Sequence, residues 1–261
     1  MKTRLTDWLE PRILGAIVAA TSALWVFVEL AEEVVEGDTK GLDRAILLAF
    51  RSPADPADPL GPRWLEEFAR DVTGLGSVGV LTILILATLG FLLLARRART
   101  ALFVLLATGG GTLASTLLKW GFDRPRPELV PHGQYVYTSS FPSGHAMLSA
   151  VVYLTLGALV ARLARDRRLK LYILALAVFL ALIIGVSRVY LGVHWPSDVL
   201  AGWAAGAAWA LACWGVAQAL RVDRERREGD GKAAAAVAHR PTIETPSPPR
   251  GGGEGRGEVG E

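Results

Sequence analysis

Long apolar runs separated by short polar segments dominate this sequence and limit what it can fold into. Each run is close to the roughly 20 residues that an α-helix needs to cross a bilayer. Hydrophobic residues make up 51% of the chain although its C-terminal segment is polar, which is too apolar for a soluble domain. The sequence therefore predicts an all-α, polytopic membrane protein with six transmembrane helices in a bundle. The expected spans are residues 13–30, 74–95, 101–118, 146–163, 171–186 and 198–220.

The first run follows a polar, basic N-terminus, which is also the pattern of a cleaved signal sequence. We favour a retained helix, because the run continues through Trp25 and Val28 without a small-x-small cleavage site. Glu29 is then expected near the far end of this helix, where its carboxylate can reach water. A functional acid inside the membrane is the less favoured interpretation.

The polar segments divide the chain into a membrane domain and a tail. Residues 1–222 are expected to form the membrane domain, with residues 31–73 as an outer loop that contains short amphipathic helices over 42–50 and 64–68. These helices are expected to lie along the membrane surface, although a small soluble lid fits the same pattern. Residues 223–261 contain alanine, proline and glycine tracts that cannot build a core, so we expect a disordered cytoplasmic tail there.

Six spans place both termini on one side of the membrane, and basic clusters at the ends of the spans indicate that this side is the cytoplasm. The N-terminus is the first of these basic clusters, and the others are residues 96–99, 162–170 and 221–227. The other polar segments then face the periplasm or the cell exterior. Basic residues usually lie on the cytoplasmic side, but four are expected on the outer side. An anionic ligand would explain their position. They are Lys119, Arg124, Arg126 and Arg188.

The outer loops combine cations with hydrogen-bond donors in a way that suits phosphate. Lys119, Arg126 and Arg188 supply positive charge, and the planar fork of arginine matches two phosphate oxygens. Ser143 is placed to cap a helix that starts at Gly144, where free backbone N–H groups and the helix dipole favour an anion. The expected substrate therefore carries negative charge spread over several oxygens.

Two histidines on the same side supply ionisable rings. Asp198 lies four residues after His194, and Pro196 suits the first turn of a helix, so the carboxylate is expected to reach the ring. His194 is then the better nucleophile, because Asp198 fixes its tautomer and stabilises the cation that forms. His145, at a helix start, is expected to protonate the departing alcohol oxygen.

The remaining residues with possible chemistry are interpreted as structural. No cluster of carboxylates or cysteines has metal-ligand spacing, so neither a metal nor another cofactor is expected, and the cations take the part of a metal. Cys213 is the only cysteine and is expected to be a buried, inert thiol. The glycines at 109–111 permit close helix packing. A salt bridge within its loop is expected for Asp123, and contact with a second phosphate is the less favoured role for Arg124.

Three motifs carry a family resemblance. They are Lys119-x6-Arg126-Pro127, Pro142-Ser143-Gly144-His145 and Ser187-Arg188-x5-His194-x3-Asp198. In this order, and without departure, they resemble the three-part signature of the type 2 phosphatidic acid phosphatase family, which includes bacterial lipid phosphatases and, more distantly, vanadium-dependent haloperoxidases. The resemblance covers about residues 74–220.

This resemblance implies a six-helix bundle with its site at the outer membrane–water boundary, and it implies no metal. It implies that phosphate is bound by Lys119, Arg126, Ser143, Gly144 and Arg188. It also implies that His194 is the nucleophile and passes through a phosphohistidine, that Asp198 supports it, and that His145 is the general acid.

The expected function is therefore that of an integral membrane lipid phosphatase acting at the outer leaflet. Undecaprenyl diphosphate, phosphatidic acid and phosphatidylglycerol phosphate are the candidate substrates, and nucleic acid is not an expected partner. A lipid phosphotransferase with the same phosphohistidine is the first alternative. A non-enzymatic anionic-lipid binder or transporter is the second, but it would not need both histidines and Asp198. The motifs leave the headgroup and the oligomeric state open.

Overall fold

The computed structural model describes residues 11–128 and 139–238. The chain forms two compact units, one up to Ala219 and one from Leu220 onward. The described residues contain helices and no strand, apart from an isolated β-bridge between Arg51 and Pro59. The helices are α1 (Pro11–Glu36), α2 (Lys40–Ala49), α3 (Arg63–Gly74), α4 (Val78–Leu94), α5 (Ala98–Gly121), α6 (Gly144–Ala161), α7 (Arg167–Tyr190) and α8 (Pro196–Ala238).

Five of these helices are long and apolar enough to cross a membrane, and the number is six if α3 and α4 together form one bent span. The expected span over residues 74–95 corresponds to α4, which has 17 residues and is bent by 46° from α3. Large apolar side chains such as Ile83, Phe91 and Leu106 are exposed on the outer helix surfaces, as lipid-facing residues are. The predicted all-α, polytopic membrane fold is thus confirmed.

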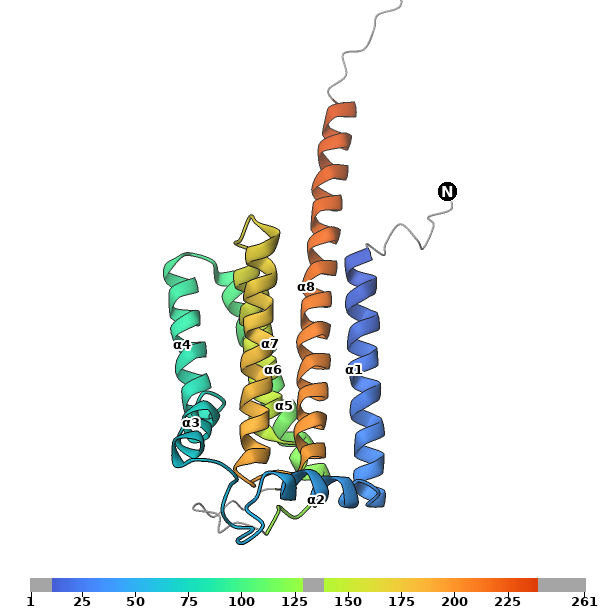
Figure 1. Ribbon diagram of the computed structural model, residues 1–261. Helices are drawn as coiled ribbons and strands as arrows, with labels where there is room; N and C mark the ends of the chain where they lie inside the picture. Colours follow the sequence, from blue (N-terminus) through green and yellow to red (C-terminus); the bar gives the residue numbers. More distant parts are fainter. Residues whose placement is uncertain (1–10, 129–138, 239–261) are drawn as a thin grey trace, which may run out of the picture. The chain divides into compact units, whose positions relative to one another are not determined.

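The loop expected between the first two spans contains the two predicted short helices, α2 and α3. Compared with the predicted ranges, α2 is shifted toward the N-terminus and α3 is longer at both ends. In Figure 1, α2 runs across the lower end of the first unit, beside the end of α7 and the start of α8. Asp43 and Leu47 on α2 are buried, with 2% and 0% exposure. The helix is therefore packed onto the bundle through a charged residue as well as an apolar one. Its position on a membrane surface stays a prediction.

Small residues let the central helices approach closely. A Cβ atom at Gly110 would lie 2.5 Å from the Trp209 ring, and one at Gly111 would lie 2.7 Å from Val151. This confirms the predicted packing role for Gly110 and Gly111, whereas a Cβ atom at Gly109 would have no neighbour within 4 Å among the described residues. A second small-residue pair, Gly202 and Gly206 on α8, lies against the backbone of α6, where Cβ atoms would approach the Ser143 and Met147 carbonyl oxygens to 2.7 and 2.5 Å.

The alternating direction of α5 to α8 decides where the motifs meet. The end of α5, the start of α6, the end of α7 and the start of α8 all lie at the lower end of the first unit in Figure 1. A core cluster supports this end, in which Phe27 of α1 and Phe141 stack with ring centroids 6.1 Å apart, next to Met147 of α6 and Ala201 of α8.

The helix α8 continues to Ala238, whereas the sequence led us to expect disorder from residue 223. The residues beyond Leu220 are rich in arginine, glutamate and alanine, all of which are good helix formers. A helix can therefore continue there without burying a hydrophobic face. Residues 239–261, including His239, lie outside the described residues, and the division at residue 222 stays a prediction.

Candidate functional site

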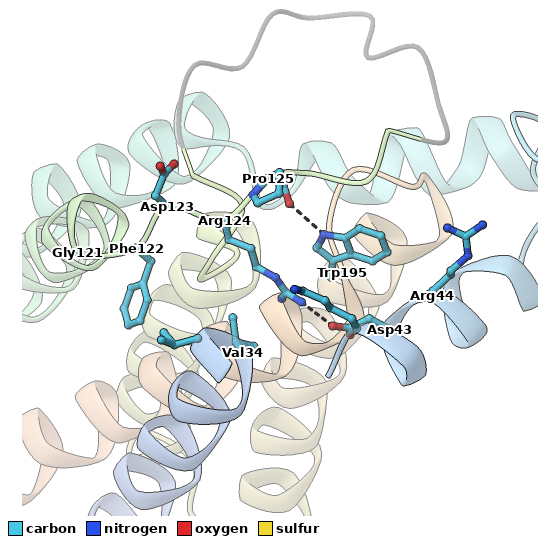
Figure 2. Close-up of a pocket in the computed structure, with 11 residues that line it drawn as sticks. Val34, Asp43, Arg44, Gly121, Phe122, Asp123, Arg124, Pro125 and Trp195 are labelled. Atoms are coloured by element: carbon cyan, nitrogen blue, oxygen red, sulfur yellow. Dashed lines mark hydrogen bonds and ion pairs between the residues drawn. The ribbon is translucent and has the colours of Figure 1, made fainter. Parts of the chain in front are cut away.

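The three motifs meet at the ends of four helices. Lys119 lies in the last turn of α5 and Arg188 in the last turn of α7. His145 lies in the first turn of α6, and Asp198 lies in the first turn of α8. The helix starts expected at Gly144 and Pro196 are confirmed. Figure 2 shows a neighbouring pocket, whose lining includes Phe122 and Arg124 from the loop after α5, Asp43 from α2, and Trp195 just before α8.

The start of α6 is fixed by Ser143. Its Oγ accepts from the backbone N–H of Ala146 at 3.5 Å, as expected for a helix cap. Its backbone N–H donates to the Asp198 carbonyl oxygen at 2.9 Å, which ties this helix start to that of α8. A Cβ atom at Gly144 would lie 3.3 Å from Lys119 Cε. The glycine therefore leaves room for a lysine beside the free N–H groups of the helix.

His194 and Asp198 form the expected pair, and both are almost fully buried. The ring Nδ1 lies 3.3 Å from Asp198 Oδ2. The same carboxylate oxygen accepts from Ser140 Oγ at 2.5 Å and from the Trp195 N–H at 2.9 Å. The turn that brings the ring back toward α8 passes through Gly192, whose φ of 73° favours glycine.

The other nitrogen of this ring faces Arg126. Arg126 Nη1 lies 3.1 Å from His194 Nε2 and also donates to the Val193 carbonyl oxygen at 3.0 Å. Because a guanidinium only donates, Nε2 must accept. The ring proton is therefore on Nδ1, facing Asp198, and the Nε2 lone pair points toward the cations. This is the tautomer that a nucleophilic Nε2 needs.

Burial lowers the pKa of His194 to about 4 from the ordinary 6.5, and the hydrogen bond to Asp198 opposes this shift. The positive charges of Arg126 and Arg188 act in the same direction as burial. The ring is therefore neutral at neutral pH. Burial also lowers the pKa of Arg126, and the Asp198 carboxylate opposes that shift.

The lowered pKa of His194 predicts a loss of stability in acid. As the pH falls from about 6.5 to about 4, the unfolded chain takes up this proton before the folded chain does, so unfolding becomes easier. We expect the wild-type chain in detergent to lose about 2 kcal/mol more stability between pH 7 and pH 4.5 than His194→Asn, which lacks the titrating ring. Parallel falls in Tm for the two proteins would contradict the assignment.

Positive charge accumulates around His194 without neutralisation. Lys119 Nζ donates to the Ser139 carbonyl oxygen at 3.0 Å, and Arg188 Nη1 donates to Thr73 Oγ1 at 3.1 Å. Over the part of the chain that the structure describes, neither these residues nor Arg126 forms an ion pair with a carboxylate. The buried Nε atoms of Arg126 and Arg188 have no hydrogen-bond partner there either. The site thus presents three cations whose charge no carboxylate ion pair neutralises among the described residues.

His145 belongs to the same cluster. Arg188, His194, Arg126 and Lys119 lie close enough for their charges to act on its ring. The bend between α3 and α4 closes the site on this side, because a Cβ atom at Gly76 would lie 3.4 Å from His145 Cδ2 and 2.4 Å from Ile184 Cγ2. The structure therefore brings together all eight predicted site residues: Lys119, Arg126, Ser143, Gly144, His145, Arg188, His194 and Asp198.

The expected salt bridge of Asp123 is wrong for the described residues. Asp123 is exposed and makes no ion pair there. Its neighbour Arg124 forms two, with Asp43 and Asp198. Sequence reasoning missed Asp43 and Ser140, and it considered Arg124 only as a possible phosphate contact and not as the partner of two carboxylates. The only signal was the position of Arg124 directly before Pro125 and two residues before Arg126. The spacing gives no indication that Asp43 on a distant helix is the partner.

A cavity of about 630 Å³ lies beside the site and not within it. Val34 and Val35 of α1, Arg44 of α2, and Phe122 and Trp195 line it, together with the outer side of Arg124. In Figure 2 the Trp195 ring closes one wall and is held by its hydrogen bond to the Pro125 carbonyl oxygen, at 3.0 Å. The three unneutralised cations do not line this cavity, so the chemistry is assigned to the buried cluster behind it.

Comparisons with known proteins show similarity to membrane phosphatases. A sequence model of the PAP2 superfamily matches residues 100–221. Phosphatidylglycerophosphatase B of Bacillus subtilis is 36% identical over 146 residues, which cover 55% of this chain and 70% of that protein. An undecaprenyl-diphosphatase of Sulfolobus acidocaldarius is 39% identical over 67 residues, which cover 26% of this chain and 28% of that protein.

One solved structure is also similar. It is the crystal structure of a transmembrane PAP2-type phosphatidylglycerolphosphate phosphatase from Bacillus subtilis. Its TM-score is 0.67 at 29% identity, and the match covers 76% of this chain and 96% of that one. The likeness thus extends beyond the matched motifs to the arrangement of the helices.

Proposed function

This chain belongs to the PAP2 superfamily and is a membrane lipid phosphatase, and from that premise we propose that it cleaves phosphate from its lipid through a phosphohistidine on His194. The observation that carries the proposal is the unneutralised group of Lys119, Arg126 and Arg188 around a buried, neutral imidazole. A phosphate group can satisfy these cations, and its phosphorus then lies within reach of Nε2.

The reaction proceeds in two balanced steps. His194 Nε2 attacks phosphorus, the new N–P bond forms, and the bond to the lipid oxygen breaks while His145 gives that oxygen a proton. Water then attacks phosphorus and gives a proton to His145, and the N–P bond breaks to release inorganic phosphate. The positive charges stabilise the equatorial oxygens in both transition states, which is the part that metal ions play in other phosphoryl-transfer sites.

Asp198 has two tasks in this scheme. Its Oδ2 holds the Nδ1 proton and so keeps the reactive tautomer. Its negative charge also stabilises the ring when the N–P bond gives it positive charge. Three donors fix this oxygen, from His194, Ser140 and Trp195, so the carboxylate needs little rearrangement during the reaction.

The relatives guide the choice of substrates. We infer that the substrate is a lipid phosphomonoester or diphosphate, and the names of the relatives favour phosphatidylglycerol phosphate and undecaprenyl diphosphate. Phosphatidic acid also carries a terminal phosphate and is the third candidate substrate. The acyl or prenyl chains remain in the bilayer beside the apolar outer surfaces of the helices, and only the headgroup enters the charged cluster.

Release of inorganic phosphate tests this function directly. The full chain, purified in detergent, is expected to release phosphate from at least one of these three lipids. Turnover is expected to stay within about twofold in the presence of a chelator, because protein cations and not a metal bind the phosphate. Chelator-sensitive turnover that Mg²⁺ or Zn²⁺ restores would contradict the metal-independent mechanism. Absence of release from all three lipids would contradict the proposed substrate class.

We further infer that both termini are cytoplasmic and that the site faces the periplasm or cell exterior, because basic clusters flank the opposite ends of the spans. In a Cys213→Ser background, Ala54→Cys is expected to react with an impermeant thiol reagent added outside intact cells or spheroplasts. Ala98→Cys, exposed at the first residue of α5, is expected to react only after the membrane is opened. The reverse pattern would contradict the proposed orientation.

A further inference from the structure

We propose that Arg124 and Asp43 are positioning residues that hold Asp198, and through it the His194 ring, in the reactive arrangement. This inference rests on the proposed function, because it concerns how the nucleophile is kept in place. It also gives α2 a role, since Asp43 is the buried charged residue of that helix.

The Arg124 guanidinium bridges two carboxylates. Nη1 donates to Asp198 Oδ1 at 2.5 Å, and Nη2 donates to Asp43 Oδ2 at 2.6 Å. The same two nitrogens also donate to Ser197 Oγ at 2.7 Å and Thr39 Oγ1 at 3.2 Å. The Arg124 side chain is 12% exposed, and those of Asp43 and Asp198 are 3% and 0% exposed. Both Nη atoms of Arg124 are thus engaged by side chains of the protein, and two of these are carboxylates.

Asp43 fixes the helix start from which Asp198 projects. Its Oδ1 accepts from the Ser197 backbone N–H at 2.9 Å, and its Oδ2 accepts from Ser197 Oγ at 2.6 Å. Pro196 cannot donate, so Ser197 offers the first N–H of α8. A carboxylate there also interacts favourably with the helix dipole. Asp43 therefore caps α8 from another helix, one residue before Asp198.

The two oxygens of Asp198 have separate tasks. Oδ2 faces His194, and Oδ1 faces Arg124. A carboxylate held on both oxygens cannot rotate away from the ring. The positive charge of Arg124 also favours the ionised carboxylate in a site where burial opposes ionisation. Arg124 therefore acts on the nucleophile through Asp198, while Arg126 contacts the ring directly.

This arrangement predicts a specific kinetic effect. Without Arg124 the carboxylate and ring are less well placed for attack, but the three phosphate-binding cations are untouched. We expect Arg124→Gln to lower kcat on the order of 10²-fold, which is typical of a misplaced catalytic group. KM is expected to stay within about threefold, because no contact to the substrate is lost. Arg124→Lys keeps the charge and is expected to recover about tenfold of that loss.

Two further variants separate positioning from folding. Asp43→Asn has the same shape and is expected to lower kcat about tenfold, with KM again unchanged. In the Arg124→Gln background it is expected to lower kcat by less than about threefold, because both residues act through one network. Arg44→Gln is the matched control, since Arg44 is exposed on the same helix and lines the same cavity. Its kinetics are expected to equal those of the wild type.

The experiment measures phosphate release by the full chain in detergent, with Tm and elution volume recorded for each variant. Wild-type release that depends on His194 establishes the proposed function independently of this inference. With that in place, the inference is overturned if Arg124→Gln keeps kcat within twofold, or if it raises KM tenfold with kcat unchanged, as for a substrate contact. If Arg124→Gln does not fold, Asp43→Asn and Arg124→Lys decide: wild-type kcat in both would overturn it.

Discussion

Replacing His194 by alanine is expected to lower kcat for phosphate release by at least 10³-fold, a loss of about 4 kcal/mol of transition-state stabilisation. The variant lacks the nitrogen that attacks phosphorus, whereas the cations that bind the headgroup remain. Binding of the lipid is therefore expected to persist, which a competition assay against wild-type turnover can measure. Turnover within about tenfold of the wild type would show that His194 is not the nucleophile.

The intermediate gives this prediction a second readout. Rapid quenching of the wild-type enzyme with radiolabelled substrate is expected to trap phosphate on the protein that is labile in acid and stable in base, as a phosphoramidate is. The label is expected to be absent from His194→Ala. His239→Ala is a control for histidine replacement elsewhere in the chain and is expected to form the labelled intermediate normally. An unlabelled wild-type enzyme that still turns over would favour direct attack by water.

The second large effect is expected from Gly202→Ala, which inserts one methyl group between α8 and α6. The new Cβ would lie 2.7 Å from the Ser143 carbonyl oxygen and 2.9 Å from Ala146 Cβ. Backbone cannot move aside as a flexible side chain can, so the helices must separate. We expect a loss of about 3 kcal/mol or more in stability. Since this contact joins the helix starts that carry His145 and Asp198, activity is expected to fall at least 10²-fold even in the folded fraction.

Gly215→Ala is the matched control for this prediction. It makes the same substitution on the same helix, where the new Cβ would lie 3.5 Å from Ala16 Cβ, an ordinary contact distance. The control is expected to keep wild-type activity and to be equally stable or up to about 1 kcal/mol more stable, because alanine favours the helix. Equal Tm values for Gly202→Ala and Gly215→Ala would contradict the close approach of α6 and α8.

The features of the site that follow from local sequence were predictable. The cap at Ser143, the helix start at Pro196 and the pairing of His194 with Asp198 depend on residues within four positions of one another. Helical geometry alone therefore brings them together. The number of apolar runs before a polar loop decides on which side of the membrane that loop lies. Since successive spans are antiparallel, the three motifs come to the same end of the bundle.

The features that depend on tertiary contacts were not predictable in this way. Arg124 meets Asp43 across 81 positions of sequence, and no periodicity specifies which of several acidic residues in the loop is buried. The angle of 46° between α3 and α4 was not predicted, because the direction of one helix relative to the next depends on tertiary packing. Gly202 and Gly206 are the exception, since their small-xxx-small spacing is visible in the sequence and indicates close helix packing.

The contact between Arg126 and His194 Nε2 bears on chemical selectivity. The lone pair of the proposed nucleophile is engaged by a guanidinium 3.1 Å away. A reagent must first draw Arg126 aside, and only anionic oxygens do so effectively. Neutral electrophiles such as alkylating agents therefore meet a ring that is both buried and masked. Under the proposed mechanism, the negative charge of the substrate would release His194, so the ring would be protected from indiscriminate modification.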